Sequence, residues 1–98
     1  MRVLAILCLL SFVPPCDLAL ENPGGSKGGA SYTFTVMSST VPVKVQVTVG
    51  GELLWTGEAK TTQEALTVDV PESARGKSLE ILAENPDGCV VAWSETVQ

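Results

Sequence analysis

The side chains that could carry out chemistry in this chain are its serines, its three cysteines and its eleven aspartates and glutamates, because the sequence contains no histidine. A serine or cysteine nucleophile is normally activated by an adjacent histidine. Histidine is also the commonest zinc ligand in proteins. The sequence therefore predicts a protein that is not an enzyme and that uses no cofactor or metal.

The carboxylates are expected to be solvated rather than catalytic. Asp69, Glu80 and Glu84 alternate with apolar residues, which places them on the solvent side of predicted strands. Glu84, Asn85 and Asp87 could together offer oxygen ligands to calcium. Residues 85–88 (NPDG) are explained equally well as a turn, since proline fixes φ at the second position and glycine accepts a positive φ. We therefore expect a turn here and no metal site.

The two tryptophans allow two interpretations. Trp55 and Trp93 each share a predicted face with an apolar neighbour, Leu53 and Val91 respectively, which is typical of core packing. A flat indole ring can instead stack on the apolar C–H face of a sugar while polar groups bind the rim of the sugar. The sequence leaves both interpretations open.

Alternation of apolar and polar residues begins at Ser31 and continues to the end of the chain. The valines of residues 43–49 alternate with polar residues, which predicts a strand with one buried face. Gly50 and Gly51 then form a two-residue link to the next strand, a strong hairpin signal. Six strands are expected, over residues 32–36, 43–49, 52–59, 66–70, 79–83 and 89–97.

These strands predict the fold class. Short strands that each have one apolar face, without a helical period after residue 20, indicate an all-β protein with two antiparallel sheets packed face to face. A small antiparallel β-sandwich is therefore expected. A domain of this size buries only a modest core, so a protein partner or a homodimer is one way in which the core could be completed.

The N-terminus has the features of an export signal. A cation at Arg2 precedes the apolar run of residues 3–13, which Pro14 and Pro15 end. This pattern is typical of a secretory leader, and the run is shorter than the about 20 residues that cross a membrane. We expect the protein outside the cytoplasm, secreted or anchored to the envelope. Lipidation of Cys16 is an alternative to an ordinary cut further along.

The remaining segment of the N-terminal region is rich in glycine. Residues 21–30 (ENPGGSKGGA) include four glycines and a proline, a composition typical of a flexible linker. The expected organisation is a leader over residues 1–20, a linker over residues 21–30 and a β-sandwich over residues 31–98. Cys89 is expected as a lone buried thiol, with a Cys16–Cys89 disulfide as the alternative.

The charge of the chain restricts its partners. The formal net charge is −5 at pH 7, and there is no cluster of lysine and arginine. Nucleic acids and anionic lipids require such clusters. We therefore expect no nucleic-acid partner, and membrane contact only through the leader or a lipid anchor.

Residues 43–98 resemble the C-terminal half of the novel putative carbohydrate-binding module family, NPCBM. The matching features are a valine-rich strand at 45–49, a hairpin at 50–54 (GGELL), a VDV strand at 68–70, the strand region 77–82, the Asp87-Gly88 turn and residues 92–94 (AWS). The resemblance implies a truncated galactose-binding-like, jelly-roll-like sandwich. It also implies a shallow carbohydrate site at Trp55, Glu84, Asn85 and Asp87.

Two functional hypotheses follow. The first, which rests on the resemblance, is an exported and non-catalytic carbohydrate-binding module. The alternative is a structural or protein-interaction β-sandwich of the cell envelope that binds no sugar.

Overall fold

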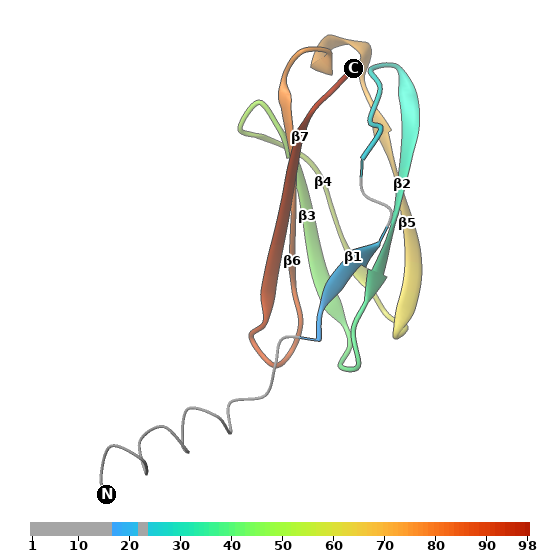
Figure 1. The fold of residues 1–98 in the computed structure, drawn as a ribbon, viewed down its shortest axis with the longest axis vertical. Coiled ribbons are helices and arrows are strands. Elements are labelled where there is room, and N and C mark those ends of the chain that lie inside the picture. The colour runs from blue at the N-terminus through green and yellow to red at the C-terminus, as the bar shows by residue number, and fades with distance from the viewer. Residues whose placement is uncertain (1–16, 22–23) are drawn as a thin grey trace, which may run out of the picture.

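The domain is a sandwich of two antiparallel sheets (Figure 1), and a computed structural model describes residues 17–21 and 24–98. The strands in the described residues are β1 (Ala19–Glu21), β2 (Ala30–Met37), β3 (Val43–Val49), β4 (Glu52–Ala59), β5 (Gln63–Val70), β6 (Ser78–Glu84) and β7 (Val90–Thr96), with a 3₁₀ turn η1 (Glu72–Ala74) before β6. One sheet has the order β1-β2-β5 and the other has the order β4-β3-β6-β7. The predicted all-β sandwich is confirmed.

The strand order can be compared with that of constant-type immunoglobulin domains. In constant-type immunoglobulin domains, the first, second, fifth and fourth strands form one sheet, and the third, sixth and seventh form the other. Here the fourth strand, β4, pairs with β3 instead, so it belongs to the second sheet. The two sheets therefore differ from the constant-type arrangement in the sheet to which β4 belongs.

The core lies between the two sheets and is built from the alternating apolar residues. β3 has a strict alternation of buried and exposed residues from Val43 to Val47. Phe34 is 1% exposed and its ring centroid lies 5.8 Å from that of Tyr32 on the same strand. They belong to the same hydrophobic core as Leu79 and Ile81 of β6, which are fully buried. The period-two pattern therefore identifies the core face of the central strands correctly.

The hairpin of β3 and β4 contains an irregularity that the sequence pattern does not reveal. The register shifts between Val47, which pairs with Trp55, and Thr48, which pairs with Leu53. Such a bulge places one extra residue on one strand and changes which face its neighbours occupy. Leu53 therefore lies on the outer face and is 58% exposed. The expectation that Leu53 and Trp55 share a face is wrong.

The glycine-rich segment packs onto the domain. Gly28 N–H donates to the carbonyl of Gln98 (3.0 Å), and Gln98 N–H donates to the carbonyl of Ser26 (2.9 Å), so the segment runs beside the end of β7. Ser26 is fully buried. Gly24, Gly25 and Gly29 have positive φ, a conformation that glycine accepts without strain. The prediction of a flexible linker is thus corrected for residues 24–30: its glycines form turns that fit the chain against the sandwich.

The first strand also lies earlier than the sequence indicates. β1 pairs with the end of β2, with Leu20 opposite Val36, and Leu18 is 4% exposed in the core. Residues 17–20, expected as part of the leader, therefore belong to the folded domain. Residues 1–16, with the rest of the predicted leader and Cys16, lie outside the described residues.

Candidate functional site

Trp55, the predicted sugar-stacking residue, lies on the inner face of β4. Its register partner Val47 is a fully buried core residue. The indole is half-buried against the core and covers Gly57, where an added Cβ would lie 2.6 Å from the ring. Trp55 therefore closes the edge of the core beside β4, as the core-packing interpretation expects.

Asn85 is a buried structural residue of the turn between β6 and β7. It is 3% exposed. Its Oδ1 accepts hydrogen bonds from Asp87 N–H (3.1 Å) and Cys89 N–H (2.9 Å), while Nδ2 donates to Ser38 Oγ (3.3 Å) and Asp17 Oδ1 (3.3 Å). An asparagine that bonds to backbone groups two and four residues ahead stabilises a turn. Both polar atoms of its amide are therefore already occupied.

The other two predicted site residues lie elsewhere. Glu84 is exposed on the outer face of the four-stranded sheet, opposite Lys44 on β3. Asp87 is exposed at the tip of the turn and accepts a hydrogen bond from Thr40 Oγ1 (3.2 Å). The structure therefore brings Asn85 and Asp87 together in one turn. It places Trp55 and Glu84 on opposite faces of the same sheet.

Trp93 lies on β7, at the opposite edge of the four-stranded sheet from Trp55. It lies on the inner face of β7 opposite the fully buried Ile81, yet it is 38% exposed. Its Nε1–H donates to Glu95 Oε1 (2.8 Å). Like Trp55, the indole covers one edge of the space between the sheets.

Glu95 is the centre of a polar cluster that sequence reasoning missed. Its Oε2 accepts from Ser26 N–H (3.0 Å) and Ser26 Oγ (2.7 Å), and its Oε1 accepts from Tyr32 Oη (3.1 Å) and Trp93 Nε1. Tyr32 Oη in turn accepts from Gly24 N–H (2.7 Å). The cluster joins β2, β7 and residues 24–28. The only indication of the cluster in the sequence is that Glu95 alternates with Val91 and Trp93, which places its side chain on the predicted inner face of the last strand.

The cluster shifts the titration of both of its ionisable groups. Burial disfavours the charged Glu95 carboxylate, but its hydrogen bonds from Ser26, Trp93 and Tyr32 outweigh this effect and hold its pKa below the usual value. Burial is the largest effect on the Tyr32 hydroxyl and raises its pKa; the hydrogen bond from Gly24 N–H opposes this, and the charge of Glu95 and its hydrogen bond raise the pKa further. Glu95 is therefore held as an anion that accepts four hydrogen bonds.

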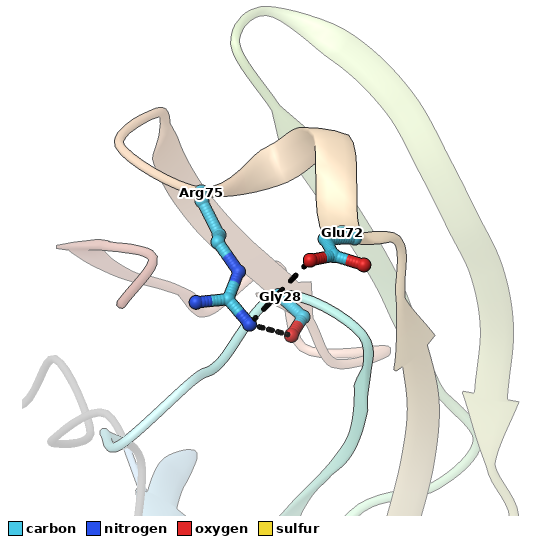
Figure 2. Close-up of polar contacts among 3 residues, drawn as sticks. All are labelled: Gly28, Glu72 and Arg75. Carbon is cyan, nitrogen blue, oxygen red and sulfur yellow. Dashed lines mark hydrogen bonds and ion pairs between the residues drawn. The ribbon is translucent and has the colours of Figure 1, made fainter.

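Arg75 contacts the same N-terminal segment from η1 (Figure 2). Its Nη2 donates to the carbonyl of Gly28 (3.4 Å) and lies 3.8 Å from Glu72 Oε1. Both charged side chains are largely exposed, so this ion pair is expected to contribute little to stability. The close approach of the chains matters more, because a Cβ at Gly28 would lie 2.5 Å from Arg75 Cγ and 3.0 Å from the Glu72 carbonyl oxygen.

Replacing Gly28 by alanine is therefore expected to lower the free energy of unfolding by about 1–2 kcal/mol, a typical cost of inserting a methyl group into a packed site. Urea unfolding followed by tryptophan fluorescence measures this change. Lys27→Ala, an exposed neighbour, is the control and is expected to stay within about 0.5 kcal/mol of the parent. Equal stability of both variants would contradict the packing of this segment.

Cys89 is disulfide-bonded, so the expectation of a lone buried thiol is wrong. It is half-buried at the end of the Asn85 turn and packs against the core.

The outer face of the four-stranded sheet carries an exposed apolar set. Leu82 is 43% exposed and Val90 is 52% exposed, and Ala92, the register partner of Leu82, is exposed as well. Leu53 lies on the same face of β4, separated from this set by Thr48 and Gln46 of β3. We call this surface the four-stranded face; its residues are Leu53, Thr56, Glu58, Lys44, Gln46, Thr48, Glu80, Leu82, Glu84, Val90, Ala92 and Ser94. Large apolar side chains that gather on an exposed surface mark interaction sites more often than scattered ones do.

A shallow groove crosses this face. Its larger part has a volume of about 360 Å³ and is lined by Lys44, Val45, Gln46, Thr56, Gly57, Glu58, Leu82 and Glu84. A second part of about 350 Å³ shares Lys44 and Glu84 and ends at Pro42, Asn85 and Pro86. The groove contains no aromatic side chain, and its floor is the sheet itself.

The four-stranded face is acidic around its apolar centre. Glu58, Lys44 and Glu84 lie side by side across three strands, and Glu80 lies two outward-facing rows further along β6, beyond Leu82. Among the residues that the structure describes, the only ion pair with a nitrogen–oxygen distance within 4.0 Å is that of Arg75 and Glu72. Lys44 is therefore not held in a close pair with either neighbouring carboxylate, and three carboxylates face solvent against one ammonium group.

Comparisons with known proteins leave the family open: no protein-family model matches the chain, and neither the curated proteins nor the solved structures gave a match. Within residues 17–21 and 24–98, no group of three histidine, cysteine or acidic residues could hold a metal ion. The described residues also contain no helix that is long and apolar enough to cross a membrane.

Proposed function

We propose that this protein is an exported, non-catalytic β-sandwich that binds a partner protein through the four-stranded face. The observation that carries the proposal is the exposed set of Leu82, Val90, Ala92 and Leu53, which no described element of the chain covers. Burying such side chains against a partner is favourable by about 25 cal/mol for each Å² of apolar surface. Apolar centres with polar rims are typical of protein–protein interfaces.

The charges on this face favour a basic partner. Glu58, Glu80 and Glu84 surround the apolar centre with only Lys44 as a counter-charge. A second copy of the chain would meet the same excess of negative charge, and the whole chain carries −5. We therefore infer a partner whose surface presents an apolar side chain among lysines or arginines, since complementary charges favour association and like charges oppose it.

The carbohydrate hypothesis has less support than the protein-binding one. Sugar recognition combines a flat aromatic platform with polar groups at its rim. Trp55 packs over Gly57 on the inner side of the sheet, the Asn85 amide is occupied by its own turn, and the groove has no aromatic lining. Glycan binding is therefore the alternative function, which a glycan array would detect.

The proposal is tested with a photo-crosslinking amino acid at position 82 in the cells that secrete the protein. A defined adduct with a basic protein is expected from position 82, and none from position 67, since Thr67 lies on the outer face of the other sheet. The adduct should weaken about tenfold or more when Glu84 is replaced by lysine and should weaken in high salt. Lys44→Glu should strengthen it.

Two results would contradict the proposal. Equal adducts from positions 82 and 67 would show that contact is not specific to the four-stranded face. Selective binding of the purified protein in a glycan array, abolished by Trp55→Ala in a variant that remains folded, would instead establish the carbohydrate-binding function.

A further inference from the structure

The disulfide of Cys89 raises the question of its partner. Cys89 is disulfide-bonded, and the other cysteines of the sequence are Cys8 and Cys16, both outside the described residues. The two candidates have different consequences. Cys8 lies in the apolar run of the predicted leader, whereas Cys16 lies directly before the folded domain.

The position of Asp17 distinguishes the two candidates. Asp17 Oδ1 accepts a hydrogen bond from Asn85 Nδ2 (3.3 Å), and Asn85 exchanges hydrogen bonds with Cys89, through Oδ1 (2.9 Å) and through its own N–H (3.0 Å). Asp17 Oδ2 is also bonded by the hydroxyl and the N–H of Ser39. Asp17 is therefore fixed beside the turn that carries Cys89.

Chain geometry then favours Cys16. Consecutive Cα atoms are about 3.8 Å apart, so Cys16 must begin next to the fixed Asp17. A disulfide requires Cα atoms about 4.4–6.8 Å apart, a separation within reach of a residue that adjoins the Asn85–Cys89 turn. Cys8 is nine positions before Asp17 and could pair only if the chain between them returned to the turn. We propose that Cys16 is the disulfide partner of Cys89.

This pairing also places the processing site. Leu18 is buried, and Ala19–Glu21 pairs with β2, so a cut after Leu18 or later would remove part of the core. With Cys16 bonded to Cys89, the leader is cut upstream of residue 16, and the Cys16 sulfur is not available for a lipid. This consequence for processing rests on the proposed export, whereas the disulfide itself does not.

The reaction is an ordinary oxidation of two thiols. One S–S bond forms and two S–H bonds break, which releases two protons and two electrons. A thiol–disulfide oxidoreductase of the oxidising compartment supplies the disulfide that accepts the electrons and becomes a dithiol. The bond forms by attack of one thiolate on the mixed disulfide of the other cysteine.

The pairing is tested on the full chain, recovered from outside the cytoplasm, with Cys8→Ser and Cys16→Ser variants. Non-reducing tryptic digestion and mass spectrometry should find residues 78–98 linked to the peptide that contains Cys16, in both the parent and Cys8→Ser. In Cys16→Ser, Cys89 should react with an alkylating reagent, and the midpoint of thermal unfolding should fall by about 10–20 °C. The intact mass should show an N-terminus upstream of residue 17 and no lipid.

Three results would overturn the inference: a link between Cys89 and Cys8, a lipid on Cys16, or a mature N-terminus beyond residue 16. A chain that stays inside the cell with residues 1–15 attached would contradict the proposed export instead. The purified reduced chain, reoxidised with oxidised glutathione, would then still have to form the Cys16–Cys89 bond. Formation of any other bond there would contradict the pairing itself.

Discussion

Replacing Asn85 by alanine is expected to lower the free energy of unfolding by about 3 kcal/mol, the largest effect that we predict for a single polar side chain. The substitution removes hydrogen bonds to Asp87, Cys89, Ser38 and Asp17 from a position that is 3% exposed. A buried donor left without a partner costs about 1–3 kcal/mol, and here two backbone N–H groups lose their acceptor. Chemical denaturation measures the change.

The matched control for Asn85 is its neighbour Asp87. Asp87 is exposed and accepts one side-chain hydrogen bond, from Thr40, so Asp87→Ala should change the free energy of unfolding by about 0.5 kcal/mol or less. Asn85→Asp retains an acceptor at Oδ1 but places a second carboxylate oxygen against Asp17 Oδ1 at a buried position, so we expect a loss at least as large as that of Asn85→Ala near pH 7. If Asn85→Ala were as stable as Asp87→Ala, the turn would not depend on the buried amide.

Replacing Glu95 by glutamine is expected to lower the free energy of unfolding by about 2 kcal/mol near pH 7. The carboxylate accepts four hydrogen bonds, two at each oxygen. In glutamine, one of these oxygens is replaced by an NH₂ group, which is itself a donor and cannot accept the two hydrogen bonds made there. Hydrogen bonds to a charged group contribute about 1.5–3 kcal/mol when buried, and Glu95 is only half-buried. Glu80→Gln, an exposed carboxylate on the opposite face of the same sheet, is the control and should be close to neutral.

The loss at Glu95 should depend on pH in a defined direction. The pKa of Glu95 is lower in the folded protein than its usual value of 4.5, so its stabilising effect is complete above that value. The effect is lost as the pH falls through the folded-state pKa, where the carboxylate gains a proton. The stability difference between the parent and Glu95→Gln should therefore narrow between pH 6 and pH 3. A constant difference would contradict the role of the charged carboxylate.

The fold could be predicted from the sequence where it depends on local pattern. The alternation in residues 43–49 and the Gly50-Gly51 link predict β3 and its hairpin, because one face of each strand is buried and the turn requires positive φ. The bulge after Val47 could not be predicted, since it depends on the pairing of β3 with β4 and leaves no period in the sequence. It reverses the face of Leu53 and so creates part of the four-stranded face.

The candidate site depends even more on contacts between distant residues. Ser26 and Glu95 are 69 positions apart and hydrogen-bonded, and a glycine-rich composition around Ser26 predicts flexibility rather than packing. Asn85 was expected at a ligand site because the resemblance to NPCBM implied one there. Its burial follows from the approach of Asp17 and Ser38, which only the folded chain reveals.

The central claim, that the four-stranded face is the binding surface, is tested most directly by nuclear magnetic resonance. Labelled protein is titrated with the basic partner recovered by crosslinking at position 82, and shifts of its backbone amide signals are mapped onto the sheet. We expect the largest shifts at Leu82, Val90 and Ala92 and at neighbouring residues of β3, with β2 and β5 unaffected. Shifts concentrated on β2 and β5, or around Trp55 on the inner side of β4, would contradict the claim.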